Sequence, residues 1–276
     1  MNANETPDSL ETSPWQGIAG QYVTQWETQL LSKWVGDVFG YYAIQLGHHG
    51  RITCLQDNRC SERYAIEQGQ GSSNPSAADA HDIRHLDVPD FAVLPFASDS
   101  IDLVVLPHTL DEHPDPHGVL REAYRVLRAE GRMVILGFNP LSIWGAQAKY
   151  CSWRTSGKNP FGFYPRLPHP PIQIGRLKDW IELLNCDVVR GAYGCYTPFV
   201  HTEHWQKRWH WMEDAGDRWW GFAGAVYALM VVKRVYSPTM IGLINEKKSG
   251  KKWVTQVATS TIHQHKNTHT PINSDK

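Results

Sequence analysis

Few cysteines, and no paired arrangement of them, occur in this chain of 276 residues. The five cysteines are odd in number, and none belongs to a C-x-x-C pair. This pattern argues against a disulfide scaffold or a zinc site and favours a reduced, cytoplasmic protein. We predict no metal, because His201, His204 and His210 have a spacing that matches no zinc motif.

The chain also has no long apolar run and no strong net charge, and its first residues do not resemble a secretory leader. The most apolar run, residues 222–232, is too short to cross a bilayer and suits a buried strand. Residues 1–13 are polar and acidic, unlike a signal peptide, and are expected to be disordered. A formal charge of −1 gives no general attraction to polyanions, and the lysine-rich residues 237–276 are expected to form a flexible basic tail.

What the sequence does contain is an alternation of helical and strand patterns over residues 14–236. Apolar residues recur every three or four positions over 15–39, which predicts an amphipathic helix. Further helices are expected at 115–131, with Gly131 as the C-cap, and at 176–186. Strands are expected at 41–46, 63–67, 101–107, 132–138, 187–193 and 224–235, whereas 51–61 fits either a helical turn or a strand. The alternation predicts a parallel α/β sheet in a single domain.

A series of short motifs fills residues 90–131. They are Asp90, Leu94-Pro95-Phe96, Asp102, Glu112-His113, Arg121-Glu122, Arg125-Val126-Leu127 and Glu130-Gly131. This series closely resembles the class I S-adenosylmethionine-dependent methyltransferases, in the group often called type 11. The Trp-rich leading helix, GFNP at 137–140 and DWIELLN at 179–185 are similar to one bacterial branch of that group, the YafS-like proteins. The resemblance covers roughly residues 15–236.

The resemblance implies a fold, a cofactor and a reaction. The fold is a Rossmann-like, doubly wound, mostly parallel sheet, the class I methyltransferase fold. The cofactor is S-adenosyl-L-methionine and the reaction is transfer of its methyl group. The resemblance supplies no acceptor.

The stretch QLGHHG, residues 45–50, departs from the family's glycine turn. The family's first strand usually ends D-x-G-x-G-x-G, whereas here Gln45 replaces the acid, Gly47 keeps the first glycine and His49 replaces the second. Glycine lets the backbone turn tightly against the cofactor, and His49 would intrude unless the loop takes another path. We expect Gly47, His49 and Gly50 to border the cofactor, with backbone N–H groups facing its carboxylate.

Two carboxylates are expected to contact the rest of the cofactor, one at the end of the second strand and one in the motif series. Glu67 lies twenty residues beyond Gly47, where dinucleotide-type folds grip two ribose hydroxyls, and Asp57 competes if ITCL is the second strand. By the resemblance, Asp90 would accept from the adenine amino group and Phe91 would lie beside the ring. The alternatives are a solvated glutamate at a strand end and an aspartate that caps a turn.

The residues after the strand 101–107 are expected near the methyl group. In open α/β sheets the ligand lies beyond the carboxyl ends of the strands, which places Pro107, His108 and Thr109 there. His108 is the candidate catalytic base or acceptor contact, and the alternative is a loop histidine that fills space over the sheet.

Other charged residues in the motifs are expected to be structural. By the resemblance, Glu112 and His113 shape the loop before the next helix. Arg121, Glu122 and Arg125 have helical spacing, which predicts a solvated helix face with salt bridges.

Residues 140–171 combine basic and aromatic side chains and contain no acid. In the resembling fold this segment often covers the acceptor. The residues are Lys149, Arg154, Lys158, Arg166, Trp144, Tyr150, Trp153, Phe161, Phe163 and Tyr164. Such a set suits an anionic, planar acceptor, either a small aromatic acid or a nucleotide, although a proline-rich lid packed for stability fits as well. The Trp-rich segment 205–220 is expected to be a lid or a packing helix.

Three hypotheses for function follow. The first is an S-adenosylmethionine-dependent methyltransferase that acts on a small molecule. The second, based on Gln45 and His49, is a methyltransferase-like binding protein with an impaired cofactor site. The third, based on residues 140–171 and the basic tail, is a nucleic-acid-associated methyltransferase. We favour the first, because a degenerate turn weakens only one set of cofactor contacts.

Overall fold

The computed structural model of the chain describes residues 18–47, 54–69, 83–154, 170–197, 218 and 220–235. The chain divides into two compact units after Val235, and all described residues belong to the unit 1–235. The predictions of a disordered start at 1–13 and of a basic tail at 237–276 therefore lie outside the described residues. Among the residues that are described, no helix is long and apolar enough to span a membrane.

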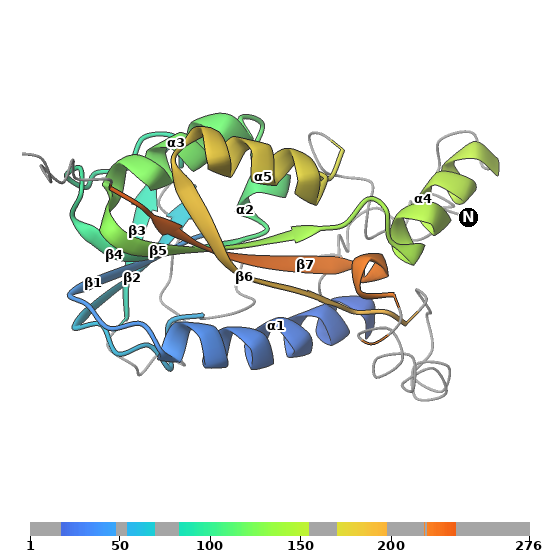
Figure 1. Cartoon of the computed structure of the whole chain (residues 1–276), viewed down its shortest axis with the longest axis horizontal. Helices are drawn as coiled ribbons and strands as arrows, with labels where there is room; N and C mark the ends of the chain where they lie inside the picture. Colours follow the sequence, from blue (N-terminus) through green and yellow to red (C-terminus); the bar gives the residue numbers. More distant parts are fainter. Residues whose placement is uncertain are drawn as a thin grey trace, which may run out of the picture. The chain divides into compact units, whose positions relative to one another are not determined.

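Seven strands form one sheet in the order β3-β2-β1-β4-β5-β7-β6 (Figure 1). They are β1 (Tyr42–Leu46), β2 (Glu62–Gln68), β3 (Ile83–Val88), β4 (Ile101–Pro107), β5 (Leu127–Phe138), β6 (Cys186–Gly194) and β7 (Val226–Lys233). The first five strands pair in parallel, and β7 runs antiparallel to both β5 and β6. The expected Rossmann-like, doubly wound, mostly parallel sheet is confirmed.

The direction in which strands are added reverses beside β1. The chain adds β2 and then β3 on one side of β1, and it returns to add β4 on the other side. In open α/β sheets a ligand crevice forms outside the carboxyl ends of the strands at such a switch point. The carboxyl edge of β1 and β4 is therefore where a site is to be sought.

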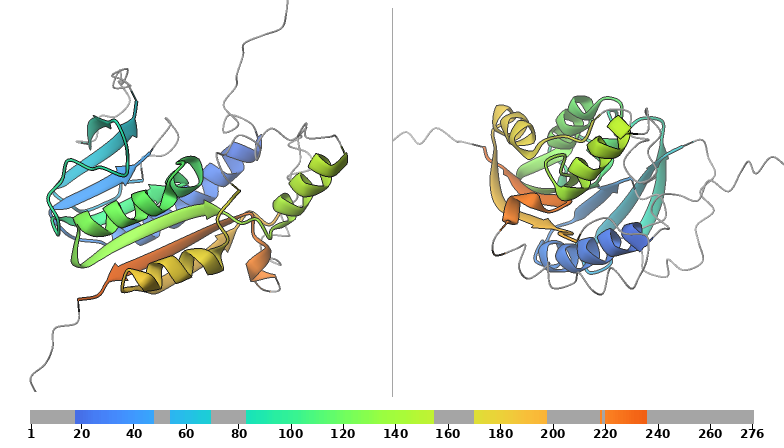
Figure 2. Two further views of the ribbon diagram at one scale, coloured as in Figure 1. Left: turned by 90° about the horizontal axis from the view of Figure 1, so that it is seen from above. Right: turned by 90° about the vertical axis from the view of Figure 1, so that its right-hand side faces the viewer.

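Helices cover both faces of the sheet (Figure 2). Helix α1 (Ile18–Gly36) lies on one face, and α3 (Pro116–Val126) and α5 (Ile174–Leu183) lie on the other. Successive residues of β4 alternate between them: Leu103 and Val105 pack in the cluster with α1, whereas Val104 and Leu106 pack in the cluster with α3. Burial on both faces explains why IDLVVLP is apolar without alternation. The remaining described helices are α2 (Thr109–Glu112), α4 (Ile143–Arg154) and the short η2 (Gly221–Ala223).

Three predicted boundaries need correction. The helix expected to reach Gly131 ends at Val126, because Leu127 turns extended, pairs with Ile101 and opens β5. Gly131 is therefore not a helix C-cap but lies inside β5. The helix expected over 176–186 ends at Leu183, and Asn185 takes a left-handed φ of 55° before β6 begins. In the ambiguous segment 51–61, residues 54–57 form a turn rather than a strand.

A buried carboxylate fixes the start of β1. Asp102 in β4 is 3% exposed, and its Oδ2 accepts hydrogen bonds from the backbone N–H groups of Tyr41 at 2.6 Å and Tyr42 at 2.9 Å. Arg128 forms an ion pair with the other carboxylate oxygen. Gly40 is required for this approach, because a Cβ at position 40 would overlap Cγ of Asp102.

We predict that Gly40→Ala destabilises the domain by about 2–4 kcal/mol, because the added methyl group displaces a buried, hydrogen-bonded carboxylate. Gly175→Ala in α5 is the matched control, since a Cβ there meets nothing within 4 Å. The control is expected to be neutral or to stabilise by up to about 1 kcal/mol. Urea denaturation measures both free energies of unfolding, and equal values for the two variants would contradict the role of Gly40.

Candidate functional site

Several predicted site residues lie at the carboxyl edge of neighbouring strands. Gly47 directly follows β1, Glu67 is near the end of β2, Asp90 follows β3, and Pro107 ends β4. The backbone N–H of Gly47 donates to the carbonyl of Ile66 at 2.8 Å, so Gly47 and Glu67 lie beside each other. Parallel pairing therefore brings residues from four strands to one edge.

Gly47 is a true left-handed position, with φ of 79°. A Cβ there would lie 3.4 Å from Oγ1 of Thr109 and 3.9 Å from the ring of Phe91. Gln45, the residue that replaces the family's acid, is buried and braces the turn: its Nε2 donates to the Gly47 carbonyl at 3.2 Å and its Oε1 accepts from the Cys54 N–H at 2.9 Å. A carboxylate can only accept hydrogen bonds, so this double role requires an amide.

His49 and Gly50 lie outside the described residues. The prediction that they border the cofactor, and the degenerate form of the turn, stay predictions. The structure describes the turn at Gly47 and again from Cys54 onward.

Glu67 and Asp57 are alternative candidates for the carboxylate at the tip of the second strand, and the choice depends on which segment forms that strand. That strand is β2, Glu62–Gln68, whereas Asp57 lies in the turn that precedes it. Glu67 is half-buried at the carboxyl edge. Asp57 is thereby removed as the residue at the tip of the second strand, and the ribose contact of Glu67 stays a prediction.

Asp90 and Phe91 lie over the glycine turn. Phe91 is buried, and its ring is among the groups nearest to Gly47. Asp90 Oδ1 accepts from the backbone N–H of Ala92 at 2.7 Å and lies 3.0 Å from Nε2 of His113. The carboxylate side chain of Asp90 is 47% exposed. His113, the C-cap of α2, thus contacts the loop after β3 through Asp90 and the loop before α3 through the Asp115 N–H.

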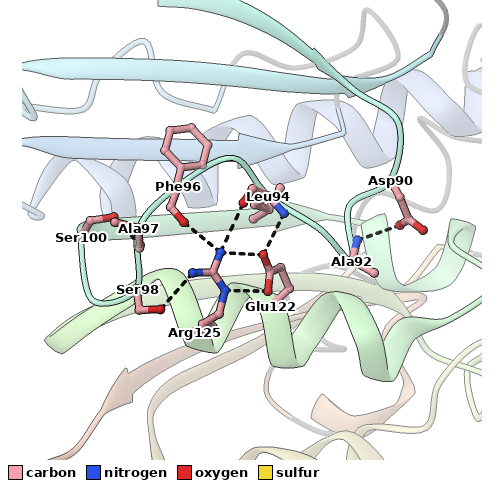
Figure 3. A network of polar contacts seen from close by, with 9 residues as sticks. All are labelled: Asp90, Ala92, Leu94, Phe96, Ala97, Ser98, Ser100, Glu122 and Arg125. Carbon is pink, nitrogen blue, oxygen red and sulfur yellow. Dashed lines mark hydrogen bonds and ion pairs between the residues drawn. The ribbon is translucent and has the colours of Figure 1, made fainter.

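The helix residues Glu122 and Arg125 hold the LPF loop in place (Figure 3). They form a two-pronged ion pair, with Arg125 Nε 2.8 Å from Glu122 Oε2 and Arg125 Nη2 2.7 Å from Oε1. Glu122 Oε1 accepts from the Leu94 N–H at 2.8 Å, and Arg125 donates to the Phe96 carbonyl at 2.9 Å. The hydrogen bond from Arg125 lowers the pKa of Glu122 and so keeps it ionised. The predicted salt-bridged face is therefore also a clamp on the loop that follows Asp90.

His108 belongs to a second, buried cluster at the same edge. It follows β4 directly, takes a left-handed φ of 57° and has no exposed surface. Its Nε2 lies 2.5 Å from Oε1 of Glu27 in α1, and its Nδ1 lies 3.3 Å from Oδ2 of Asp111 in α2. Its ring stacks on Phe138 with centroids 4.1 Å apart, and Asp111 Oδ2 also accepts from the Phe138 N–H at 2.8 Å.

The two carboxylates keep His108 protonated. Burial lowers its pKa, but the charges and hydrogen bonds of Glu27 and Asp111 outweigh burial and raise the pKa from 6.5 to about 9. Burial, reinforced by Glu27, raises the pKa of the nearby Cys195 thiol, which therefore stays neutral. Both ring nitrogens of His108 face carboxylates, so this arrangement does not present a basic nitrogen to an acceptor.

Sequence reasoning missed Glu27 and Asp111, which complete this cluster, and it named Thr109 without its contact to Leu46. The signal for Glu27 is present: it lies four residues from Val23 and from Leu31, on the face of α1 that is otherwise buried and apolar. Thr109 donates its hydroxyl hydrogen to the carbonyl of Leu46, the residue before Gly47. The His108 turn is thereby joined to α1 on one side and to the glycine turn on the other.

The raised pKa of His108 predicts a pH-dependent stability. The folded protein holds a proton on His108 that the unfolded chain releases above about pH 6.5, so this contribution is complete below that pH and is lost as pH rises through about 9. The free energy of unfolding of the wild type, minus that of His108→Gln, is expected to fall by about 1.4 kcal/mol per pH unit across this window. Urea denaturation at several pH values measures the difference. His117→Gln, at an exposed position of α3, is the control, and an equal slope for both variants would rule out the assignment.

Part of the predicted lid is described in α4. Lys149, Tyr150 and Trp153 are exposed there, and the rings of Tyr150 and Trp153 lie 6.4 Å apart. Trp144 is instead buried and donates its indole N–H to the Thr197 carbonyl at 2.7 Å. The side chains of Arg154, Lys158, Phe161, Phe163, Tyr164 and Arg166, and most of segment 205–220, lie outside what the structure describes.

Comparison with known proteins finds a family match and a relative. The family described as "Methyltransferase domain" matches residues 39–135, which span β1 to β4, α3 and most of β5. The protein YafS of Escherichia coli (strain K12) is 30% identical over 203 residues, which cover 73% of this chain and 71% of YafS.

Solved structures share the fold at low sequence identity. A methyltransferase from Thermotoga maritima, described as S-adenosylmethionine-dependent, is 15% identical, covers 79% of this chain and 92% of its own, and has a TM-score of 0.54. The [4+2]-cyclase SpnF is 17% identical, covers 79% of this chain and 83% of its own, and has a TM-score of 0.50. These likenesses establish the fold, which accommodates more than one reaction.

Proposed function

Because the chain belongs to the class I S-adenosylmethionine-dependent methyltransferases, we propose that it transfers the methyl group of S-adenosyl-L-methionine to a small anionic or aromatic acceptor. One observation carries the proposal. Gly47, Glu67, Asp90 and Phe91 come from the ends of three neighbouring strands and lie at one edge of the sheet.

These residues suit a nucleoside with an amino-acid tail. The left-handed Gly47 leaves space beside Phe91 that a Cβ would narrow. Glu67 would accept from the ribose hydroxyls and Asp90 from the adenine amino group, with Phe91 beside the ring. Backbone N–H groups from Gly47 to Gly50 would meet the carboxylate, and Pro107 would line the side of the methyl group.

S-adenosyl-L-methionine supplies a methyl group that its sulfonium sulfur already activates. The work of the chain is therefore alignment and exclusion of water. We assign His108 to this work as a positioning residue, because its ring is buried between Glu27 and Asp111. It holds the turn after β4. The following residue, Thr109, donates a hydrogen bond to the carbonyl of Leu46 at the end of β1.

Exposed residues of α4 support the class of acceptor. Lys149, Tyr150 and Trp153 combine a cation with aromatic faces, in a segment that has no acid between residues 140 and 171. A planar, anionic acceptor would gain from both features. A nucleic acid would demand a wider basic surface, and the net charge of −1 argues for a small molecule.

A second candidate is a binding protein that retains the fold without catalysis. It rests on Gln45, which stands where the family carries an acid. Gln45 in the structure braces Gly47 and Cys54, so its replacement of the acid is compatible with a built turn. Cofactor binding alone does not separate the two candidates, whereas turnover of an acceptor does.

Cofactor binding is the first test. We expect isothermal titration with S-adenosylhomocysteine to give saturable heat, and Gly47→Ala to weaken binding about tenfold or more, because the added Cβ lies 3.4 Å from Oγ1 of Thr109 and narrows the space beside Phe91 that the cofactor would occupy. Gly175→Ala serves again as the matched control, because its Cβ points into open space. Absence of heat for the wild type at high ligand concentration would count against the proposal.

Methyl transfer is the second test. Incubation with isotope-labelled S-adenosyl-L-methionine and a panel of aromatic carboxylates, phenols and nucleotides is expected to label an anionic aromatic member. Replacing both Tyr150 and Trp153 with Ala should raise KM by about tenfold or more, because a stacked aromatic contact contributes roughly 1–3 kcal/mol. Turnover confined to neutral aliphatic acceptors, or to nucleic acid, would contradict the proposed acceptor class.

A further inference from the structure

The carboxylate of Asp90 is held by one of its two oxygens. Oδ1 accepts from the Ala92 N–H at 2.7 Å and from the imidazole of His113 at 3.0 Å. Oδ2 has no hydrogen bond to any described residue, and the side chain is 47% exposed. Asp90 therefore has one oxygen fixed by the protein, while the side chain stays partly exposed to solvent (Figure 3 shows its bond to Ala92).

The neighbours of His113 fix which of its ring nitrogens donates a hydrogen bond to Asp90. Its side chain is only 4% exposed, and its Nε2 faces a carboxylate, which can only accept, so Nε2 carries hydrogen. In the neutral ring, Nδ1 then accepts from the Asp115 N–H, 3.1 Å away. The backbone of His113 is held as well, because its N–H donates to the Thr109 carbonyl at 3.1 Å.

We infer that His113 is a specificity-determining residue for the purine of the cofactor, acting through Asp90. By occupying Oδ1, it leaves Oδ2 to accept from the amino group of a 6-amino purine. A 6-oxo purine places an acceptor at the same point and meets a carboxylate oxygen that cannot rotate away. The inference rests on the proposed adenine contact of Asp90 and adds a residue to it.

His113 matters for binding because it fixes the side chain of Asp90 in one conformation before the cofactor binds. A half-exposed aspartate on a loop would otherwise sample several rotamers, and binding would have to select one. The bonds from Ala92 and His113 select it beforehand. The Glu122–Arg125 clamp holds the loop that follows, so the backbone around Asp90 is also fixed.

The bond from His113 also predicts how an amide at position 90 would orient. In Asp90→Asn, the donating Nε2 of His113 requires the amide oxygen, which turns the amide nitrogen towards the purine. That nitrogen is a donor and suits a 6-oxo group. The preference between purines is therefore expected to shift in the opposite direction, and the shift should be smaller without His113, because the Ala92 N–H alone then holds the amide oxygen.

Titration calorimetry with S-adenosylhomocysteine and S-inosylhomocysteine tests the inference through binding alone. The wild type is expected to prefer the adenosyl ligand by about tenfold or more, as one hydrogen bond to a charged group implies. His113→Phe, which keeps an aromatic ring but no donor, should reduce this preference several-fold. His113→Gln, whose amide can replace Nε2 as donor, should retain most of it. Asp90→Asn should shift the preference towards the inosyl ligand, and Asp90→Asn with His113→Phe should show a smaller shift, because only the Ala92 N–H then orients the amide.

Several outcomes would overturn the inference. A folded His113→Phe variant with the wild-type preference would make His113 merely structural, and so would an equal shift for Asp90→Asn with and without His113. His113→Asn, which is too short to reach Asp90, takes the place of the Phe variant should the latter fail to fold by circular dichroism. Equal binding of both ligands by the wild type would defeat this inference alone, whereas binding of neither would defeat the proposed function as well.

Discussion

The ion cluster of Glu27, His108 and Asp111 is the interaction on which the ligand edge depends. It joins three elements that are distant in sequence: α1, the turn after β4, and α2, whose Asp111 also bonds to the end of β5. Burying charge is costly, and removal of one partner would leave another charge uncompensated in the core. Loss of any one of the three charged groups would therefore destabilise the other two. The cluster also holds His108 in a left-handed conformation that a β-carbon disfavours.

Residues next to this cluster in the sequence contact the glycine turn and the loop after β3. Thr109 follows His108 and bonds to Leu46, which precedes Gly47. Asp90 reaches the same region from the other side, held by His113 and by the clamp of Glu122 and Arg125. Side chains between residues 109 and 125, from α2, the turn after it and α3, thus contact both loops at this edge of the sheet. In this chain, several of the family's motif residues contact the loops that contain Asp90 and Gly47 or lie next to them.

Much of the fold follows from local pattern. The uninterrupted apolar run of β4 reports burial on both faces, and the spacing in α1 reports one buried stripe. Boundaries follow less well: Leu127 belongs to a favourable helical pattern but leaves the helix, because pairing with Ile101 competes with one more helical turn. The spacing from Gly47 also placed Glu67 near the end of β2, and the parallel register that pairs Leu46 with Ile66 brings the two positions side by side.

The sequence by itself determined the class of sheet, the residues that end its strands and the family to which the chain belongs, because periodicity and motif spacing are local properties. Only the tertiary structure shows what His108 contacts. An isolated histidine after a strand is an equally good candidate for a base or for a filler. Its two carboxylate partners lie 81 residues before it and three residues after it, and packing of α1 against the sheet creates the low-dielectric site in which their charges raise its pKa.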